Sequence, residues 1–144
     1  MGRPGFCQPR TVEKLRVLPA AVIGNPLSTP IRILGWVGEW ANRDPAEPHW
    51  HLGPVAVEPT LQMQGVGSAM LRAFCSVIDC LHAPAYLETD KPQNVHFYER
   101  YGFRTIESAE MLGVRNWFMS RAPQPGAASL PNICKNFSDR QPGI

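Results

Sequence analysis

A short glycine-bearing segment, Gln62-Met63-Gln64-Gly65-Val66-Gly67-Ser68, has the residue types of an anion-binding turn. The apolar run before it, over residues 49–58, predicts a strand, and the periodic apolar run after it, over 68–81, predicts a helix. The first N–H groups of a helix lack intrahelical partners, and the helix dipole adds roughly half a positive charge there. Because glycines let a phosphate approach the backbone, the sequence predicts a site for a phosphorylated ligand.

The segment does not match the two commonest phosphate-binding loops. No Gly-Lys-Ser/Thr follows it, so it is not a Walker loop, and Met70 stands where a dinucleotide fingerprint has its third glycine. Two other interpretations stay open: an ordinary strand–turn–helix junction, and an unrelated nucleotide-binding α/β domain that shares only the glycine turn.

A second set of motifs lies further along the chain. It comprises a strand-like Ala85-Tyr86-Leu87-Glu88-Thr89, Asn94 near a helix start, Phe97-Tyr98-Glu99-Arg100, and a closing Gly102-Phe103. With the earlier Gln-x-x-Gly-x-Gly pattern, and in this order, these motifs resemble the GNAT family of N-acetyltransferases over about residues 49–121. The segment 116–121 looks most like the puromycin N-acetyltransferase branch of that family.

The resemblance implies a fold and a co-substrate. The expected fold is the α/β (α+β) GNAT acyl-CoA N-acyltransferase fold, with a central mixed, mostly antiparallel sheet flanked by helices. The expected co-substrate is acetyl-CoA, without a metal ion. Residues 62–68 would hold its pyrophosphate, and backbone groups of Val55-Ala56-Val57 would bind the acetyl carbonyl and the pantetheine arm. Asn94 would contact the pantetheine, and Tyr98 would lie beside the sulfur.

The chemistry of acetyl transfer assigns roles to these groups. A phenol with a pKa near about 10 can donate a proton to a thiolate of similar basicity, so Tyr98 is the expected acid. The base is less determined: Glu88, near the end of its strand, is the candidate preferred here, with Glu58 and His51 as alternatives. A helix N-cap would explain Asn94 equally well, and sheet packing would explain Tyr98.

The expected function is acetyl-CoA-dependent N-acetyltransfer to a primary amine of a small molecule, by direct attack. The alternative is a non-catalytic coenzyme A-binding or partner-binding module derived from the same fold. Loss of turnover with retained coenzyme binding in Tyr98→Phe would distinguish the two.

Composition argues against several other classes of protein. At 144 residues with 44% hydrophobic content, the chain is one domain with enough apolar residues for a core. A net charge of +2 argues against a basic face that grips nucleic acid. No apolar run approaches the roughly 18 residues of a membrane span, and the N-terminal residues lack a basic region followed by a hydrophobic one, so we expect no secretory signal. The four cysteines lack metal-ligand spacing, so we expect reduced packing residues and a cytoplasmic location.

The elements that must position these groups define three segments. Residues 1–28 are expected to be partly helical or loose, 29–121 to form the core, and 122–144 to be a flexible tail. Thr29-Pro30 predicts a helix start, and Ile33, Trp36, Val37 and Trp40 then follow helical spacing, although a strand over 31–37 stays open. Trp36 and Trp40 would anchor this helix to the core or, with Trp50, line an acceptor pocket. Further along, we expect a strand over 85–89, a helix over 94–101, and final strands over 103–108 and 115–121.

The region before the glycine turn is short for this family. A GNAT domain is expected to carry a strand, two helices and a strand hairpin there, and only 48 residues precede the apolar strand. The resemblance therefore implies shortened or missing N-terminal strands. A sheet edge left without its neighbour can be covered by a second chain, so we expect a homodimer.

Overall fold

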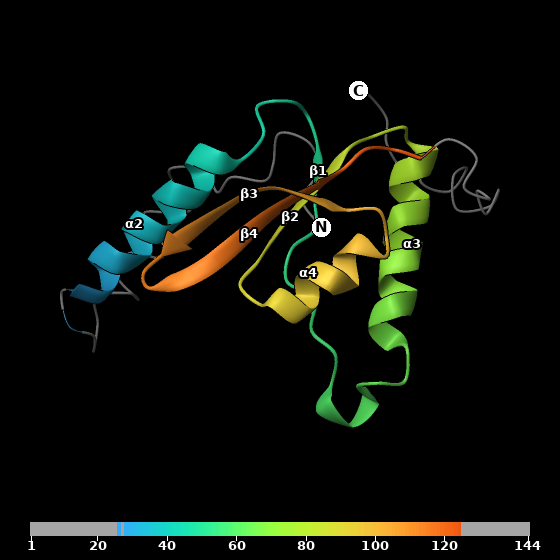
Figure 1. Ribbon diagram of the computed structural model, residues 1–144, viewed down its shortest axis with the longest axis horizontal. Coiled ribbons are helices and arrows are strands. Elements are labelled where there is room, and N and C mark those ends of the chain that lie inside the picture. Colours follow the sequence, from blue (N-terminus) through green and yellow to red (C-terminus); the bar gives the residue numbers. More distant parts are fainter. Residues whose placement is uncertain (1–25, 27, 125–144) are drawn as a thin grey trace.

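The computed structural model describes residues 26 and 28–124. The expectations for residues 1–25 and 27 and for the tail beyond 124 therefore lie outside the described residues. The described elements are helix α2 (Ser28–Arg43), strand β1 (Trp50–His51), the 3-10 helix η1 (Pro59–Leu61), helix α3 (Val66–Cys80), strand β2 (Ala85–Thr89), helix α4 (Pro92–Glu99), strand β3 (Arg104–Met111) and strand β4 (Val114–Arg121), as Figure 1 shows.

The strands form one sheet of order β1-β2-β4-β3. β1 pairs with β2 in parallel, whereas β2–β4 and β3–β4 are antiparallel. The sheet is thus mixed and mostly antiparallel, as the family resemblance implied. A two-residue turn, Leu112-Gly113, joins β3 to β4 with φ angles of 54° and 80°. Positive φ at both positions matches the twist of a tight hairpin and favours glycine.

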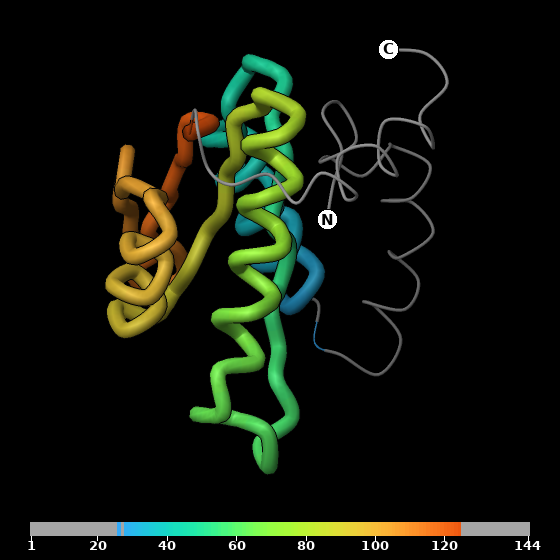
Figure 2. The backbone as a smooth tube through the Cα atoms, turned by 90° about the vertical axis from the view of Figure 1, so that its right-hand side faces the viewer, coloured from blue at the N-terminus to red at the C-terminus, as the bar shows by residue number. Residues whose placement is uncertain are grey.

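One face of the sheet carries the main core. Apolar residues of α3, including Leu71, Phe74 and Ile78, pack there against Leu87 of β2 and Met119 of β4. Residues of α4 belong to the same cluster, so α3 and α4 lie side by side on this face (Figure 2). Alternation along each strand turns the neighbouring residues to the opposite face.

The opposite face is covered by α2. Tyr86, Met111 and Phe118 form a second buried cluster, against which Trp40 of α2 packs. The Tyr86 hydroxyl donates a 3.2 Å hydrogen bond to the Arg43 carbonyl, which fixes the last turn of the helix on the sheet. The described chain is therefore a three-layer arrangement with α2 on one side and α3 and α4 on the other.

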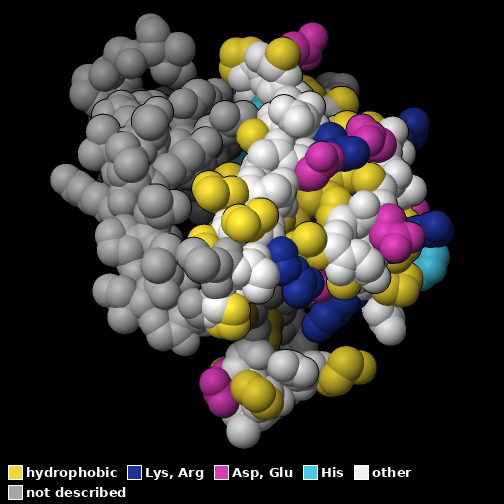
Figure 3. Space-filling view, turned by 90° about the vertical axis from the view of Figure 1, so that its left-hand side faces the viewer, with side chains coloured by type: hydrophobic (Ala, Val, Ile, Leu, Met, Phe, Trp, Pro, Cys, Tyr) yellow, Lys and Arg dark blue, Asp and Glu magenta, His cyan; other side chains and the backbone are white. Residues whose placement is uncertain are grey.

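The helix interpretation of residues 29–40 is confirmed, and the strand alternative over 31–37 is wrong. The apolar stripe of this helix is only partly covered by the described residues. Ile33 and Trp36 are 40% and 38% exposed, whereas Trp40 is half-buried. Figure 3 views the molecule from the α2 side and shows hydrophobic side chains at the surface there.

The strand expected over 49–58 is much shorter in the structure. Only Trp50 and His51 pair as β1, and the Leu52 amide adds one more bond, 2.9 Å long, to the Tyr86 carbonyl. Pro54 has no N–H group to continue the ladder, which accounts for the break. Residues 53–58 therefore run free of β2, and Pro59 starts η1.

Two helix starts also differ from the sequence-based boundaries. α3 begins at Val66, two residues earlier than expected, because Gly65 adopts φ +81° and serves as its N-cap. α4 begins at Pro92 with Lys91 as its N-cap. The interpretation of Asn94 as an N-cap is therefore wrong, and its side chain is used differently.

Cysteine usage departs from expectation at one position. Cys75 is a free, buried thiol whose pKa is raised by burial, in keeping with a packing role. Cys80, however, is disulfide-bonded, so the expectation that all four cysteines are reduced is wrong. No helix in the described part of the chain is long and apolar enough to cross a bilayer.

Candidate active site

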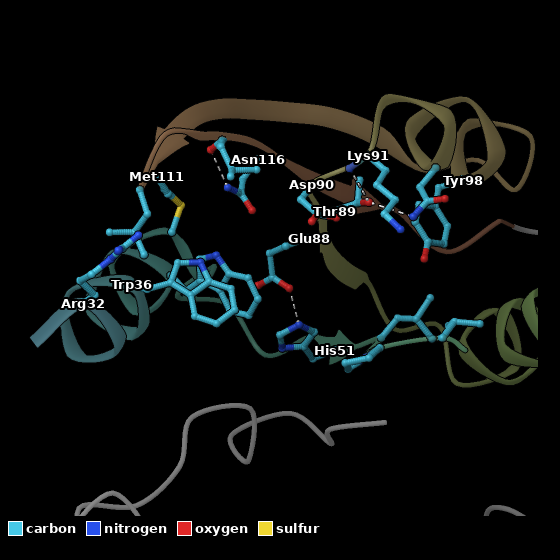
Figure 4. Close-up of a pocket in the computed structure, with 18 residues that line it drawn as sticks. Arg32, Trp36, His51, Glu88, Thr89, Asp90, Lys91, Tyr98, Met111 and Asn116 are labelled. Atoms are coloured by element: carbon cyan, nitrogen blue, oxygen red, sulfur yellow. Dashed lines mark hydrogen bonds and ion pairs between the residues drawn. The ribbon is translucent and has the colours of Figure 1, made fainter. Parts of the chain in front are cut away.

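A cavity of about 780 Å³ opens where β1 and β2 part. It is lined by Arg32, Trp36, Trp40, residues 51–55, residues 88–91, Asn94, Tyr98, Met111, Leu112, Val114 and Asn116. These residues come from α2, the segment after β1, the end of β2, α4 and the β3–β4 hairpin. Figure 4 shows Tyr98 at one end, Arg32 at the other, and His51 with Glu88 between them.

His51 and Glu88 form the polar centre of the cavity. The Nε2 atom of His51 lies 2.8 Å from Oε2 of Glu88, whose side chain is only 7% exposed. An ionised carboxylate can only accept, so Nε2 carries the hydrogen and Nδ1 is the remaining ring nitrogen. The hydrogen bond that His51 donates to Glu88 raises the pKa of His51, against the opposing effect of burial.

The sequence ranked Glu88 as the preferred base and His51 only as an alternative. The structure brings both into one pair. Strand register was the available signal: His51 is opposite Tyr86 in the parallel ladder, and Glu88 follows Tyr86 by two residues on the same face. The strand was expected to run on to residue 58, so the sequence did not show that pairing ends at His51 and that the cavity opens directly after it. Glu58 precedes η1 and is not part of the cavity lining.

Tyr98 lies at the end of the cavity that is furthest from Arg32 (Figure 4). Its side chain is 8% exposed and packs edge-to-face on Phe103, with ring centroids 6.0 Å apart. Burial raises the pKa of the phenol, so it keeps its proton at neutral pH. In Figure 4 the hydroxyl of Tyr98 points into the cavity. Packing and a reactive hydroxyl are thus compatible at this residue.

Asn94 is held beside Tyr98 by the loop after β2. Its Nδ2 donates a 3.2 Å hydrogen bond to Oγ1 of Thr89, and the Lys91 amide donates to the same oxygen at 3.4 Å. The Thr89 hydroxyl therefore fixes the first turn of α4. Asn94 lines the cavity with its amide oriented by this contact.

The glycine segment leads into α3 in the manner expected of an anion site. The first intrahelical bond runs from the Ala69 amide to the Gly65 carbonyl at 2.9 Å, so the amides of Val66, Gly67 and Ser68 point out of the helix end. A Cβ at Gly67 would meet only Phe97 and Val57, each at 3.8 Å. The segment lies at the end of α3 that adjoins η1 (Figure 1).

The side chains of the two glutamines in the segment donate hydrogen bonds to nearby backbone carbonyls. Gln62 Nε2 donates to the Val57 carbonyl at 3.0 Å, and Gln64 Nε2 donates to the Thr60 carbonyl at 2.7 Å. Met63 is fully exposed with φ 61°. These two glutamine side chains therefore shape the turn.

A free segment of backbone connects the glycine turn with the cavity. Val55 lines the cavity, Cγ2 of Val57 lies 3.8 Å from where a Cβ on Gly67 would be, and Ala56 lies between the two valines. Of the predicted site residues, Val55, Glu88, Asn94 and Tyr98 meet in the cavity, whereas residues 62–68 lie beyond its lining at the end of α3. Trp50, considered for the acceptor pocket, is instead buried in the main core.

Arg32, Trp36 and Trp40 line the α2 end of the cavity, so these tryptophans do more than anchor the helix. Arg32 was missed by the sequence reasoning. Its i, i+4 spacing from Trp36 was the signal that could have found it. Among the described residues, no group of three or more His, Cys, Asp or Glu side chains converges as a metal site.

The sequence profile of the acetyltransferase (GNAT) family matches residues 24–103, which is more than half of the chain's 144 residues. The chain belongs to the acetyltransferase (GNAT) family. This membership removes the alternative of an unrelated nucleotide-binding domain. The family uses acetyl-CoA as its co-substrate.

Three solved structures are similar to the chain. One is a protein of Agrobacterium tumefaciens described provisionally as an acetyltransferase, at 24% identity and a TM-score of 0.46 over 50% of this chain and 55% of that one. The second is nourseothricin acetyltransferase, at 21% identity and 0.45 over 51% and 49%. The third is an acetyltransferase at 20% identity and 0.46 over 66% and 56%. The matched region thus spans about half the length of each of these proteins.

Proposed function

We propose that the chain is an acetyl-CoA-dependent N-acetyltransferase that acetylates a primary amine of a small molecule by direct attack. The observation that carries the proposal is the separation of residues 53–57 from β2. This separation leaves the N–H groups of residues 55–57 without a partner in β2, between a helix end suited to a pyrophosphate and a cavity that holds a candidate acid and base.

Residues 55–57 and the helix end would hold acetyl-CoA. The amides of Val66, Gly67 and Ser68 would bind the pyrophosphate, and the pantetheine arm would follow residues 57 to 55 toward Tyr98. An N–H group of Val55-Ala56-Val57 would hydrogen-bond the acetyl oxygen and stabilise the negative charge that develops on it. Asn94 would orient the arm from the α4 side.

His51 and Glu88 would remove the proton from the attacking amine. Glu88 accepts from Nε2–H and so leaves Nδ1 of His51 to receive that proton. The amine nitrogen bonds to the acetyl carbon, the carbon–sulfur bond breaks, and Tyr98 gives its proton to the departing thiolate. Tyr98 regains a proton from water, and the imidazolium releases one, which restores both groups.

The test is an amine-library screen with acetyl-CoA, read by release of free thiol and by mass of the product. We expect one or more primary amines to be acetylated. Tyr98→Phe should lower turnover by about 10² or more while coenzyme A binding persists. Glu99→Gln, on the exposed side of the same helix, is the matched control and should keep turnover.

The second candidate is a coenzyme A-binding or partner-binding module without turnover. Such a protein would bind coenzyme A yet acetylate nothing in the library, and Tyr98→Phe would have no activity to lose. A cytoplasmic location stays a prediction, and the disulfide at Cys80 removes one of the grounds given for it.

A further inference from the structure

We propose that the acceptor amine carries a flat apolar body and, at its far end, an anionic group that binds Arg32. This inference rests on the proposed function, because it concerns the acceptor side of the same cavity. It follows from the order of side chains along the cavity between Tyr98 and α2 (Figure 4).

The middle of the cavity suits a protonated amine before it reacts. Glu88 is nearly buried beside His51, and Asp90 lines the wall further toward α4. The carboxylate of Glu88 attracts an ammonium group to this point, near the ring of His51. The reacting nitrogen of the acceptor is therefore assigned to this part of the cavity.

The next part of the cavity is a slot with aromatic and aliphatic walls. Trp36 and Trp40 lie together on α2, with ring centroids 4.4 Å apart. Across from them, Met111, Leu112 and Val114 of the hairpin line the same cavity. Trp36, Leu112 and Val114 are 38%, 53% and 47% exposed, so the described residues leave these walls uncovered. A flat apolar group between them would bury that surface.

Arg32 supplies the positive charge at the α2 end. It forms no hydrogen bond or ion pair with any other described residue, whereas Arg43 on the same helix binds both Glu39 and Glu107. Arg32 is also the only charged side chain that α2 contributes to the cavity lining. A guanidinium matches the geometry of a carboxylate or phosphate, which it can bind through two parallel hydrogen bonds.

Helix geometry sets the length of the acceptor. Arg32, Trp36 and Trp40 are spaced by four residues, so they share one face of α2, and the Cα atoms of the first and last are about 12 Å apart. Trp40 packs against the cluster that contains Tyr86, and the His51 ring lies 5.7 Å from the Tyr86 ring, centroid to centroid, which places the reactive end near Trp40. The distance between the anionic group and the amine of the acceptor is thus on the order of 10 Å, since it follows the stretch of helix from Arg32 to Trp40. Polycationic acceptors are disfavoured because Arg32 would repel a second ammonium group.

A matched set of rigid acceptors tests the inference. The probe is 4′-(aminomethyl)biphenyl-4-carboxylate, compared with its neutral primary carboxamide and with the dication 4,4′-bis(aminomethyl)biphenyl. Thiol release gives kcat/KM, and titration calorimetry in the presence of coenzyme A gives Kd. The proteins are the full chain, Arg32→Gln, Arg32→Lys and Trp36→Ala. The control is Arg104→Gln, an exposed arginine of β3 outside the cavity.

The full chain should favour the carboxylate over the amide by about fivefold, the scale of an exposed charge pair. Arg32→Gln should bring that ratio to about one, through KM rather than kcat, because Arg32 lies away from the reacting atoms. Arg32→Lys should retain part of the preference, Trp36→Ala should weaken both compounds equally, and Arg104→Gln should change nothing.

A carboxylate-to-amide ratio at or below one, or a ratio that Arg32→Gln leaves unchanged, overturns the inference. The Kd ratio decides this even where no thiol is released. Absence of turnover with every amine instead counts against the proposed function, so the two failures are distinguishable.

Discussion

His51 on β1 and Glu88 on β2 come within 2.8 Å, Nε2 to Oε2, at the point where the two parallel strands separate. β1 ends at His51, and β2 continues for three residues beyond Tyr86, its partner in the ladder. The pair therefore has core on one side and open cavity on the other. A titratable pair in this position can be tested through its pH dependence.

We expect kcat/KM to rise with pH through the pKa of His51, with a midpoint above about 6.5, the value of an unperturbed histidine. The reason is that the hydrogen bond to Glu88 raises this pKa and the proposed base must be neutral. Glu88→Gln should move the midpoint down toward about 6.5, and His51→Gln should lower the rate by about 10². Initial rates across pH measure all three; an identical midpoint in Glu88→Gln would contradict the role of the pair.

The same pair predicts a pH dependence of stability. The folded pKa of His51 lies above the unfolded one, so the stabilisation is complete below about pH 6.5 and is lost as pH rises through the folded pKa. The difference in thermal midpoint between the full chain and Glu88→Gln should therefore shrink with rising pH. Thermal melts at several pH values check this, and a difference that grows instead would mean that another group dominates.

Coenzyme A should raise the thermal midpoint, since a ligand at 100 times its Kd stabilises the folded state by about 2.7 kcal/mol. Gly67→Val should abolish the shift without unfolding the protein, because the nearest atoms lie 3.8 Å from the position of a Cβ. Gly65→Val is a less clean test, because φ +81° disfavours any side chain there.

Gly35→Ala is the control for the glycine substitutions. It lies on α2 with nothing within 4 Å, so it should keep the coenzyme shift and stabilise the protein slightly. Thermal melts with and without millimolar coenzyme A measure the shift in thermal midpoint for each variant. A normal shift in Gly67→Val would show that the helix end is not the pyrophosphate site.

Asp79 on α3 and Arg121 on β4 form a buried bidentate pair with distances of 2.6 and 2.8 Å. Burial acts to raise the pKa of Asp79, but the hydrogen bonds from Arg121 and the Gln124 amide together lower it. Removing one partner leaves a buried charge, so Asp79→Asn should cost about 3 kcal/mol of unfolding free energy. Denaturant titration measures this.

Glu39→Gln is the matched control for Asp79→Asn, because the Glu39–Arg43 pair on α2 is exposed. It should leave the denaturation midpoint close to that of the full chain. Equal losses in the two variants would show that burial does not distinguish these ion pairs.

We expect a dimer in solution. β1 lies at the edge of the described sheet, and α2 bears Ile33, which is 40% exposed and lies outside the cavity lining. A second chain would cover such surface. Sedimentation at micromolar concentration tests this, and a single species at the chain mass of 16.0 kDa would contradict it.

Local sequence determined the parts of the fold that depend on short-range patterns. The strand at Ala85–Thr89 was predicted at its observed bounds from its short, mostly apolar run. All but one of its residues are buried. The order of the glycine turn, Asn94 and Tyr98 predicted the family. These signals depend on a few neighbouring residues, so they can be recognised in the sequence without the tertiary structure.

Only the tertiary structure decided how distant side chains meet. The length of β1 depends on where Pro54 breaks pairing with β2, and this break sets the opening beside His51 and Glu88. Thr89 binds Asn94 across the turn into α4, which no N-cap pattern predicts. Arg32 belongs to the cavity because α2 packs on the cluster of Tyr86 and Phe118, which lies more than 40 positions beyond the helix along the chain. The sequence determined the family and the position of the glycine turn. Packing between remote segments determined which polar groups share the cavity, because the distances between these groups depend on how the layers stack.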